Sequence, residues 1–379
     1  MKFIIDDKIP YIKGALEPFD EVIYLSGSKT TPSIVKDADA IITRTRTICN
    51  EQLLSGSSVK FIATATIGFD HIDTAYCDGA GIKWTNAPGC NSKSVEQYIA
   101  SALFVLAAQK GFRLKGKTIG VVGVGQVGSK VARVCELLGM KVLLNDPPRA
   151  REEGTDKFCG FDEIMQTADI ITFHVPLNMQ GEDATFHLAD SRFFEKLKRR
   201  PIVFNSCRGE VLDTFSSKEA MRKGQISGLV IDCWENEPSI DLELLGMADL
   251  ATPHIAGYSK DGKANGTSMS IQAVSRFFGL GIDDWQAQQV DLPAKTTIEL
   301  NGLNLSEEDI LSKAVLTTYD IRTDDAAFRK NTDLFEKLRG DYPVRREYPV
   351  YTIHAANMEE TTLDILKSLG FKIQERKIS

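Results

Sequence analysis

Short apolar runs alternate with polar segments along the first 90 residues of the chain. Ten to twenty residues of helical or turn-like sequence separate each run from the next. The runs lie at residues 3–5, 21–24, 40–43, 61–64 and 82–84. Strands at this spacing, with polar turns between them, predict a small parallel α/β unit.

A second β/α alternation follows a long predicted helix at residues 91–110. Its apolar strands are expected at residues 118–122, 141–145, 170–173, 202–204 and 229–231, and the pattern ends near Pro253. With a sixth strand that ends at Leu250, the six parallel strands from Ile119 onward predict a Rossmann-type doubly wound sheet. We expect residues 258–280 to form a helix that returns the chain to the first unit. The doubly wound sheet would then be inserted into a flavodoxin-like α/β domain.

The pattern changes again from about residue 284, where a polar stretch begins. Beyond it we expect strands near residues 296–300, 350–353 and 371–373, with helices near residues 307–317 and 358–369. About ninety residues of mixed α+β structure are consistent with a separate small module.

The sequence Gly-Val-Gly-Gln-Val-Gly at residues 123–128 lies between a predicted strand and an amphipathic helix. Glycines in this position allow a tight turn and a close approach of a pyrophosphate to the backbone. The helix N-terminus adds unpaired N–H groups and positive potential. The predicted cofactor-binding residues of this loop are Gly123, Gly125, Gln126, Val127 and Gly128.

The next predicted strand ends at Asp146, eighteen residues past Gly128. A carboxylate there is placed to accept hydrogen bonds from an adenosine ribose, and its charge would repel a 2′-phosphate. The sequence therefore favours NAD over NADP. The alternative is a glycine-rich turn that only packs a helix on a strand, with Asp146 as a solvated strand end.

The amino-acid composition limits the partners and the cellular compartment that we expect for the protein. The 379 residues are 42% apolar and 26% charged, with a net charge of −7, which argues against a general nucleic-acid or anionic-membrane surface. The longest apolar stretch, around residues 99–108, is shorter than the ~18 residues of a membrane span. Seven cysteines without a C-x-x-C pair predict neither disulfides nor a zinc site, so we expect a reducing cytoplasm and no bound metal. The acidic N-terminus is predicted as a strand rather than a signal peptide.

Three polar segments follow predicted strands of the doubly wound sheet, at residues 205–210, 232–238 and 252–258. Open α/β sheets bind ligands at these strand ends. Oxidation of a 2-hydroxy acid needs a cation that clamps the carboxylate, which suits the forked guanidinium of Arg208. It also needs a carrier for the alcohol proton, which suits His254, and a carboxylate such as Glu237 would orient the imidazole and stabilise its protonated form.

Each of these residues alone has an ordinary structural alternative. Arg208 could be a surface residue at a helix start, His254 a satisfied loop histidine and Glu237 a turn residue. Their joint occurrence downstream of the glycine loop favours a catalytic set.

The glycine loop with Arg208, Glu237 and His254 resembles the D-isomer-specific 2-hydroxyacid dehydrogenase family over residues 1–280. Longer strings narrow the resemblance to one branch of that family, and they lie at residues 87–91, 145–149, 252–259, 319–325 and 345–347. This resemblance implies NAD-dependent oxidation, at C2, of a phosphorylated four-carbon 2-hydroxy acid in pyridoxal phosphate biosynthesis.

The resemblance also implies roles for individual residues. Arg208 and Glu237 would be active-site residues, and His254 the proton donor in the reductive direction. Contacts with NAD are implied for Asp146, Cys207, Asp232 and Gly257, with Val175 nearby through its backbone. Contacts with substrate are implied for Thr45, Thr66 and Tyr258. The family often has serine at the position of Thr45, which keeps the hydroxyl and adds a methyl group.

These expectations give a division of the chain into three domains. Residues 1–92 and 258–283 form the predicted substrate-binding domain, residues 93–257 the NAD-binding domain and residues 284–379 the C-terminal domain. The resemblance implies that the C-terminal domain builds a homodimer.

Arg44 and Arg46 follow the predicted strand at residues 41–43 and are candidates for binding a substrate phosphate. Alternation along a strand would put both side chains on one side, toward the expected interdomain cleft. Basic residues at a strand end are also common on plain surfaces. We hypothesise that Arg44, with Arg346 from a partner subunit, binds the phosphate.

Two other functions stay open at this point. The chain could be another dehydrogenase of the family, acting on phosphoglycerate or glycerate. It could also be an NAD-sensing binding protein that resembles the corepressors of this family, although the presence of Arg208, Glu237 and His254 disfavours that reading.

Overall fold

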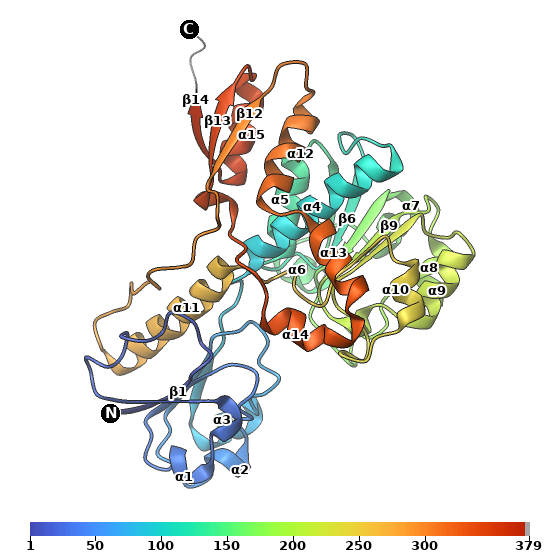
Figure 1. The fold of residues 1–379 in the computed structure, drawn as a ribbon. Coiled ribbons are helices and arrows are strands. Elements are labelled where there is room, and N and C mark those ends of the chain that lie inside the picture. Colours follow the sequence, from blue (N-terminus) through green and yellow to red (C-terminus); the bar gives the residue numbers. More distant parts are fainter. Residues whose placement is uncertain (376–379) are drawn as a thin grey trace. The chain divides into compact units, whose positions relative to one another are not determined.

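The computed structural model describes residues 1–375, and their contacts group into two compact units (Figure 1). The first unit comprises Met1–Asn91 and Ser259–Asp291, and the second comprises Ser92–Tyr258 and the chain from Leu292 onward. Residues 376–379 of the predicted C-terminal domain lie outside the described residues, and the three-domain division stays a prediction. Within residues 1–375, no helix has the length and apolar character needed to cross a membrane.

A five-stranded parallel sheet forms the centre of the first unit, in the order β2-β1-β3-β4-β5. This is the flavodoxin-like order, as predicted. The strands are β1 (Lys2–Asp6), β2 (Glu21–Leu25), β3 (Ala40–Thr43), β4 (Phe61–Thr64) and β5 (Lys83–Thr85). Alternate side chains of β1 pack on opposite faces, because successive strand residues point to opposite sides of a sheet. Phe3 and Ile5 face α11 (Lys260–Phe278), while Ile4 faces α1 (Pro32–Val35), α2 (Glu51–Leu54) and α3 (Thr74–Ala80).

A six-stranded parallel sheet forms the centre of the second unit, in the order β11-β10-β9-β8-β6-β7. This arrangement confirms the predicted doubly wound sheet. The strands are β6 (Thr118–Val122), β7 (Lys141–Asn145), β8 (Ile170–Phe173), β9 (Ile202–Asn205), β10 (Gly228–Ile231) and β11 (Leu250–Ala251). The strand order reverses at β6, between β7 and β8, and a reversal of this kind marks the ligand-binding end of such sheets.

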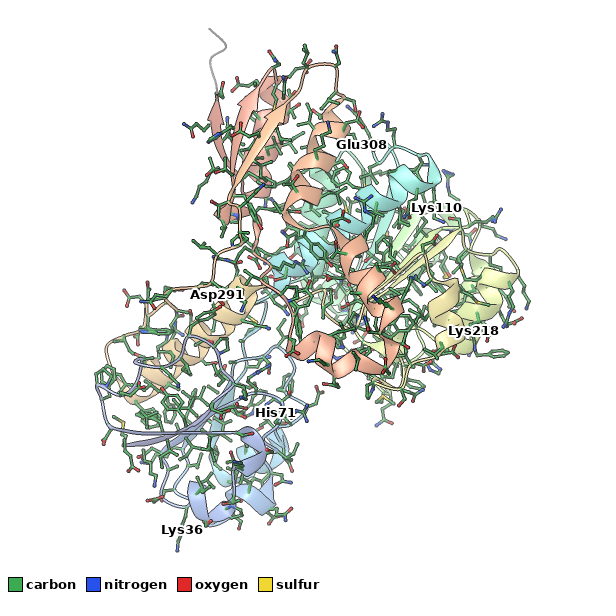
Figure 2. The ribbon with its side chains drawn as sticks, viewed as in Figure 1. Lys36, His71, Lys110, Lys218, Asp291 and Glu308 are labelled. Atoms are coloured by element: carbon green, nitrogen blue, oxygen red, sulfur yellow. The ribbon has the colours of Figure 1, made fainter. Side chains whose placement is uncertain are left out.

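Helices cover both faces of the six-stranded sheet. On one face lie α4 (Ser92–Lys110) and α5 (Gly128–Leu137). On the other face lie α7 (Phe161–Thr167), α8 (Ser191–Lys196), α9 (Thr214–Arg222) and α10 (Leu242–Met247). Lys110 lies at the end of α4 (Figure 2). It pairs with Asp249, just before β11, at 2.7 Å and so ties this helix to the sheet.

The C-terminal chain adds a small three-stranded sheet with the order β12-β13-β14. Its elements are β12 (Thr297–Asn301), α12 (Glu307–Thr318), β13 (Thr352–Ala356), α15 (Glu360–Leu369) and β14 (Lys372–Glu375). Both strand pairs are parallel, which corrects the predicted α+β arrangement to α/β. Parallel strands need long crossover connections, and helices supply them here. β13 begins two residues later than predicted, because Tyr348–Val350 forms a 3₁₀ turn.

Two helices that the sequence analysis missed, α13 (Ile321–Lys330) and α14 (Phe335–Gly340), lie against the six-stranded sheet domain (Figure 1). Phe328 of α13 joins the core on the α7–α10 face of that sheet. Asp325 accepts a hydrogen bond from the backbone N–H of Ala251 at 2.7 Å, on the edge strand β11. The C-terminal chain therefore covers the β11 edge of the sheet, which would otherwise be open to pairing with another strand.

Helix α4 buries a carboxylate, Glu96, whose side chain is only 6% exposed. Burial raises the pKa of Glu96 to about 7, although nearby Arg133 and Lys93 oppose the shift. The folded chain thus holds this proton more tightly than the unfolded chain, so the native state loses stability as the pH rises from about 4.5 to about 7.

Replacing Glu96 by glutamine should therefore stabilise the fold at pH 8, by up to about 3 kcal/mol, and much less at pH 5. Urea unfolding at the two pH values measures the difference in free energy. Glu136→Gln, on an exposed position of the neighbouring helix α5, is the control and should change little at either pH. An equal gain at both pH values for Glu96→Gln would contradict the assignment.

Candidate active site

The glycine loop between β6 and α5 has the conformation that its sequence predicts. Gly123 has a φ of +85°, and a Cβ atom there would lie 2.6 Å from the carbonyl oxygen of His174. A Cβ on Gly128 would lie 1.9 Å from the carbonyl oxygen of Gly123, so no larger residue fits. At Gly125, by contrast, an added Cβ atom would have no neighbour within 4 Å. Both Gly125 and Gln126 are exposed. The outer face of the loop is therefore open for a ligand to approach the backbone.

Asp146 joins the end of β7 to this loop. Its Oδ2 accepts a hydrogen bond from the N–H of Val124 at 2.8 Å, and its Oδ1 caps α6 (Pro147–Glu153) through the N–H of Arg149 at 3.1 Å. A carboxylate oxygen has more than one acceptor site, and Asp146 is only half-buried. These residues fit a dinucleotide, with the loop backbone for the pyrophosphate and Asp146 for ribose hydroxyls.

The predicted cofactor residues at the ends of β8 and β9 lie next to the loop. A Cβ on Gly123 would touch the Val175 side chain at 2.8 Å, and the Cys207 sulfur lies beside the Val175 backbone. Burial raises the pKa of Cys207 to about 11, so it is a neutral thiol that donates to Asn205 Oδ1 at 3.2 Å. The structure thus brings together Gly123, Val175 and Cys207 from three different strand ends.

His174 lies within this group but is not suited to carry a proton. Burial lowers the pKa of His174 to about 3, so its ring is neutral at physiological pH. Its Nε2 lies 2.9 Å from the hydroxyl of Thr172, and its Nδ1 is buried without a hydrogen-bond partner in the described chain. A neutral, buried ring is suited to line the cofactor region rather than to act as a base.

Arg208 follows β9 and is held by its backbone. The Asn205 side chain donates to the Arg208 carbonyl at 2.9 Å and, more weakly, to the Cys233 carbonyl at 3.4 Å, so it links the loops after β9 and β10. Gly209 packs directly on the second loop, since a Cβ there would lie 1.9 Å from the carbonyl oxygen of Trp234. Nη1 of the Arg208 guanidinium donates a hydrogen bond to the Cys207 carbonyl at 2.9 Å. Within residues 1–375 its other donors are not engaged, which leaves them for a bound carboxylate.

His254 and Glu237, for which the sequence predicts an acid–base role, lie in hydrogen-bond contact. His254 Nδ1 and Glu237 Oε2 are 2.8 Å apart, and Glu237 Oε1 accepts a second hydrogen bond from the N–H of Trp234 at 2.8 Å. An ionised Glu237 requires the proton on Nδ1, so Nε2 is the atom that exchanges a proton. Nε2 contacts no other hydrogen-bonding group of the described residues, and the His254 side chain is 32% exposed. The pair is therefore oriented for proton transfer to a ligand.

The backbone around His254 is unusual and firmly held. His254 has a φ of +55°, a left-handed conformation that is rare for residues with a side chain. Its N–H donates to the Asp232 carbonyl at 2.8 Å. The buried Asp232 carboxylate accepts from the N–H groups of Ile255 at 2.7 Å and Ala256 at 2.9 Å. Burial raises the pKa of Asp232. Asp232 thus supports the His254 loop, and its contact with NAD stays a prediction, as does that of Gly257.

Cys233, Glu237 and His254 could together approach a metal ion, since their ligand atoms lie within 4.8 Å of one another. Burial raises the pKa of Cys233 well above its usual range, which keeps a neutral thiol at this position. Two members of the group, His254 and Glu237, already share a hydrogen bond of 2.8 Å, which is the geometry of an acid–base pair.

The predicted substrate residues of the first unit lie at the ends of its strands. Thr45 is exposed after β3, and the Thr66 hydroxyl donates to the Gly68 carbonyl at 2.9 Å after β4. Arg44 is half-buried and donates to the Lys8 carbonyl at 3.1 Å. The expectation that Arg44 and Arg46 alternate along one strand is wrong, because β3 ends at Thr43, Arg44 follows the strand end and Arg46 lies in a turn.

Sequence reasoning missed Lys263, near the start of α11 in the first unit. Burial lowers the pKa of Lys263 to about 8, and the positive charges of Arg44 and Lys260 add to the effect. Three cations therefore lie close together near one helix N-terminus, and one of them, Lys260, is paired with Asp291 Oδ2 at 2.8 Å. The spacing of Lys260 and Lys263 across one helical turn was the available signal.

Tyr258, the third predicted substrate residue, packs against the C-terminal chain. Its ring meets the Tyr342 ring edge-on at 5.8 Å, and the Arg339 guanidinium lies 5.8 Å from the Tyr258 ring centre. Arg339 was missed by sequence reasoning. Arg346 is only 8% exposed within its own chain, and its predicted role across a dimer stays a prediction.

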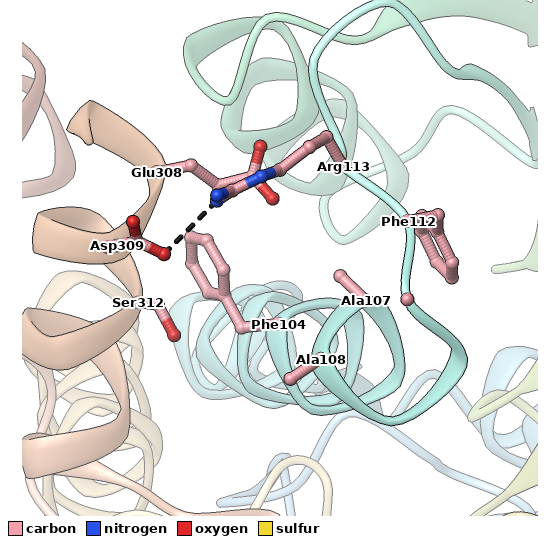
Figure 3. Close-up of a pocket in the computed structure, with 9 residues that line it drawn as sticks. Phe104, Ala107, Ala108, Phe112, Arg113, Glu308, Asp309 and Ser312 are labelled. Carbon is pink, nitrogen blue, oxygen red and sulfur yellow. Dashed lines mark hydrogen bonds and ion pairs between the residues drawn. The ribbon is translucent and has the colours of Figure 1, made fainter. Parts of the chain in front are cut away.

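Two cavities, of about 360 and 350 Å³, lie elsewhere in the second unit. They border the end of α4 and the start of α12, where Arg113 pairs with Asp309 at 3.1 Å (Figure 3). Neither cavity is lined by a predicted site residue, so we assign neither to catalysis.

Comparisons with known proteins agree with this geometry. A family model described as "D-isomer specific 2-hydroxyacid dehydrogenase, NAD binding domain" matches residues 93–256, and a domain of unknown function matches residues 291–370. The solved structure of a D-lactate dehydrogenase from Aquifex aeolicus, complexed with NAD and lactic acid, is 28% identical. It superposes with a TM-score of 0.61 over 75% of this chain and 97% of that one. Fold and site thus define a dehydrogenase of the D-isomer-specific 2-hydroxyacid class, with NAD as its cofactor.

Longer matches narrow the class. An erythronate-4-phosphate dehydrogenase from Bacteroides fragilis is 53% identical over 93% of this chain and 99% of its own length. One from Porphyromonas gingivalis is 41% identical over 98% of this chain and 100% of its own length. The chain belongs to the erythronate-4-phosphate dehydrogenase family.

Proposed function

We propose that the chain oxidises 4-phospho-D-erythronate at C2 to (R)-3-hydroxy-2-oxo-4-phosphobutanoate, with NAD as the oxidant, as a step of pyridoxal 5′-phosphate biosynthesis. The 2.8 Å contact between His254 Nδ1 and Glu237 Oε2 carries this proposal, because it orients an imidazole for proton transfer beside a nucleotide site. The relatives named erythronate-4-phosphate dehydrogenase support the substrate.

Three residues would share the chemistry. Arg208 binds the substrate carboxylate through its unengaged donors and draws electron density from the adjacent carbon. His254 Nε2 takes the proton of the C2 hydroxyl, and Glu237 stabilises the resulting imidazolium. NAD, when bound, accepts the hydride that leaves C2. In the reverse direction His254 returns the proton to the carbonyl oxygen.

We further propose that Thr45, Thr66 and Tyr258 contact the substrate and that Arg44 binds its phosphate. The closeness of Arg44 and Lys263, near the start of α11, supports this position for an anion. A homodimer built through the C-terminal domain, with Arg346 of a partner subunit near the phosphate, is part of the same proposal. Sedimentation equilibrium of the purified protein tests the dimer.

Replacing Arg44 by alanine should raise the KM for 4-phospho-D-erythronate by roughly tenfold or more, since charge-assisted hydrogen bonds are among the stronger ones. The KM for unphosphorylated D-erythronate should change little, because that substrate offers no phosphate. Steady-state kinetics with both substrates measures the difference. Lys60→Ala removes an exposed cation of the same unit and serves as the control. Equal effects of Arg44→Ala on both substrates would contradict the assignment.

The activity itself is tested by incubating the purified protein with 4-phospho-D-erythronate and NAD, with and without 2-oxoglutarate as a second hydride acceptor. Mass spectrometry then detects the 2-oxo product even if NADH stays bound. Oxidation of 3-phosphoglycerate or glycerate instead would identify another dehydrogenase of the class. NADH binding without turnover of any 2-hydroxy acid would favour a sensing protein.

A further inference from the structure

The backbone of the two residues that follow His254 is held from both sides. On one side the Asp232 carboxylate accepts the N–H groups of Ile255 and Ala256. On the other side the carbonyl oxygens of the same two residues accept hydrogen bonds from Arg345 Nη1, at 3.4 and 3.3 Å. Arg345 belongs to the C-terminal chain, about 90 residues beyond the loop that it contacts.

Arg345 is itself fixed in place by the second unit. Its Nε donates to Gln97 Oε1 at 2.8 Å, and its Nη2 donates to the Ser94 carbonyl, both on α4. Its guanidinium lies 3.7 Å from the centre of the Tyr319 ring, within the range of a cation–π contact. The side chain is only 4% exposed. Every nitrogen of the guanidinium is therefore engaged, and the charge is shielded from water.

A second layer holds the Tyr319 ring. The hydroxyl groups of Tyr319 and Tyr342 both donate to the Asp324 carboxylate, at 2.9 and 2.6 Å. Asp324 is near Arg345, and its negative charge offsets the buried cation. The side chains of four residues thus form a connected polar network that ends on the backbone of the His254 loop: Tyr319, Asp324, Tyr342 and Arg345.

The left-handed backbone of His254 explains why such support matters. A residue with a side chain stays in this conformation only when its surroundings determine it. Asp232 fixes the N–H groups of Ile255 and Ala256. Among their carbonyl groups, that of Ile255 also accepts the N–H of Tyr258 at 2.8 Å, and Arg345 holds both carbonyls from outside the loop. A small rotation there would turn the imidazole away from Glu237, and misplacement of a catalytic group lowers the rate steeply.

We propose that Arg345 is a positioning residue for catalysis. Through Arg345, the C-terminal chain keeps the His254 imidazole within hydrogen-bond distance of Glu237. On this view the C-terminal chain contributes to the active site of its own subunit, in addition to its proposed role in the dimer. The kinetic part of the test rests on the proposed function, whereas the exchange part does not.

Arg329 provides a matched control. It is also an arginine of the C-terminal chain, and it also donates to two backbone carbonyls, those of Leu245 and Ala248, each at 2.7 Å. Those carbonyls belong to the segment before β11 rather than to the His254 loop. Replacing Arg329 therefore measures what the loss of such an anchor does to the fold alone.

The experiment compares Arg345→Lys and Arg329→Lys with the unchanged protein by hydrogen–deuterium exchange and by the pH profile of kcat. For Arg345→Lys we expect the amides of Ile255 and Ala256 to exchange about tenfold faster or more, because the hydrogen bonds of the charged fork are lost. We expect kcat to fall by roughly tenfold to a hundredfold with a displaced pH profile, and the KM for NAD to change little. Arg329→Lys should speed exchange only near residues 245–251, and its kcat and pH profile should stay as in the unchanged protein.

Two results would overturn the proposal. One is unchanged exchange at Ile255 and Ala256 in Arg345→Lys. The other is faster exchange of these two amides in Arg345→Lys while its kcat and pH profile match those of Arg329→Lys. That result would show that Arg345 supports the fold without affecting catalysis. Should Arg345→Lys not fold, Gln97→Met removes the acceptor of Arg345 Nε and is expected to act in the same direction. An unchanged protein that exchanges normally but oxidises no 4-phospho-D-erythronate would refute the proposed function and leave the exchange test intact.

Discussion

Replacing His254 by alanine should lower kcat for 4-phospho-D-erythronate by roughly 10²–10⁴-fold, because the variant has no positioned group to take the hydroxyl proton. The KM for NAD should change little, since the glycine loop and Asp146 hold the dinucleotide. With substrate deuterated at C2, the slower variant should also show a changed isotope effect, because proton transfer then limits the step. Stopped-flow and steady-state kinetics together measure these quantities.

His187→Ala is the matched control for this prediction. His187 Nε2 also meets a glutamate, Glu235, at 2.6 Å, so the two histidines have the same kind of partner. The other carboxylate oxygen of Glu235 accepts a hydrogen bond from the N–H of Thr214 at the start of α9. This contact gives the His187–Glu235 pair a structural role. We expect His187→Ala to keep kcat within a few-fold of the unchanged protein. Comparable losses in both variants would mean that His254 acts through stability and not through proton transfer.

The parts of the fold that the sequence predicts are those whose signals are local. The glycine loop, β6, α5 and β7 occupy about thirty consecutive residues, and glycine spacing, strand runs and helix periodicity all lie within that window. Gly123 and Gly128 are required by contacts within the same motif and with the next strand end. Arg208, Glu237 and His254 were found because each follows a recognisable strand at the ligand-binding end of the sheet.

The parts that the sequence does not predict depend on contacts between distant residues. Helix α13 has few apolar residues, and its place is set by Phe328 in a core made elsewhere and by Asp325 on the edge of β11. Arg345 and Gln97 are 248 residues apart, so no local pattern indicates their contact. The same limit applies to Asp232: the resemblance implies a contact with NAD, which stays a prediction, and no local pattern indicates its hydrogen bonds with residues 252–256.

Arg208 offers the other large effect, and its charge and its shape can be separated by experiment. Alanine at this position should lower kcat/KM by roughly 10²–10⁴-fold, because it removes both the charge and the paired donors aimed at the substrate carboxylate. Lysine keeps the charge but offers no planar fork, so Arg208→Lys should regain only part of the loss. Added guanidinium ion should restore some activity to Arg208→Ala, since the backbone of the loop is fixed independently by Asn205.

The control for Arg208 is Arg222→Gln, which removes an arginine that pairs with Glu219 at 2.6 Å on the outer helix α9. It should leave kcat/KM unchanged within error, because that pair lies among exposed side chains where single ion pairs contribute little. If Arg208→Lys were as active as the unchanged protein, a simple positive charge would suffice and the fork would not matter. If guanidinium failed to rescue Arg208→Ala while calorimetry showed an intact fold, the residue would act on NAD binding or loop geometry rather than on the substrate carboxylate. Measuring the Kd for NADH in the same variants separates these two readings, since a substrate clamp should leave that constant unchanged.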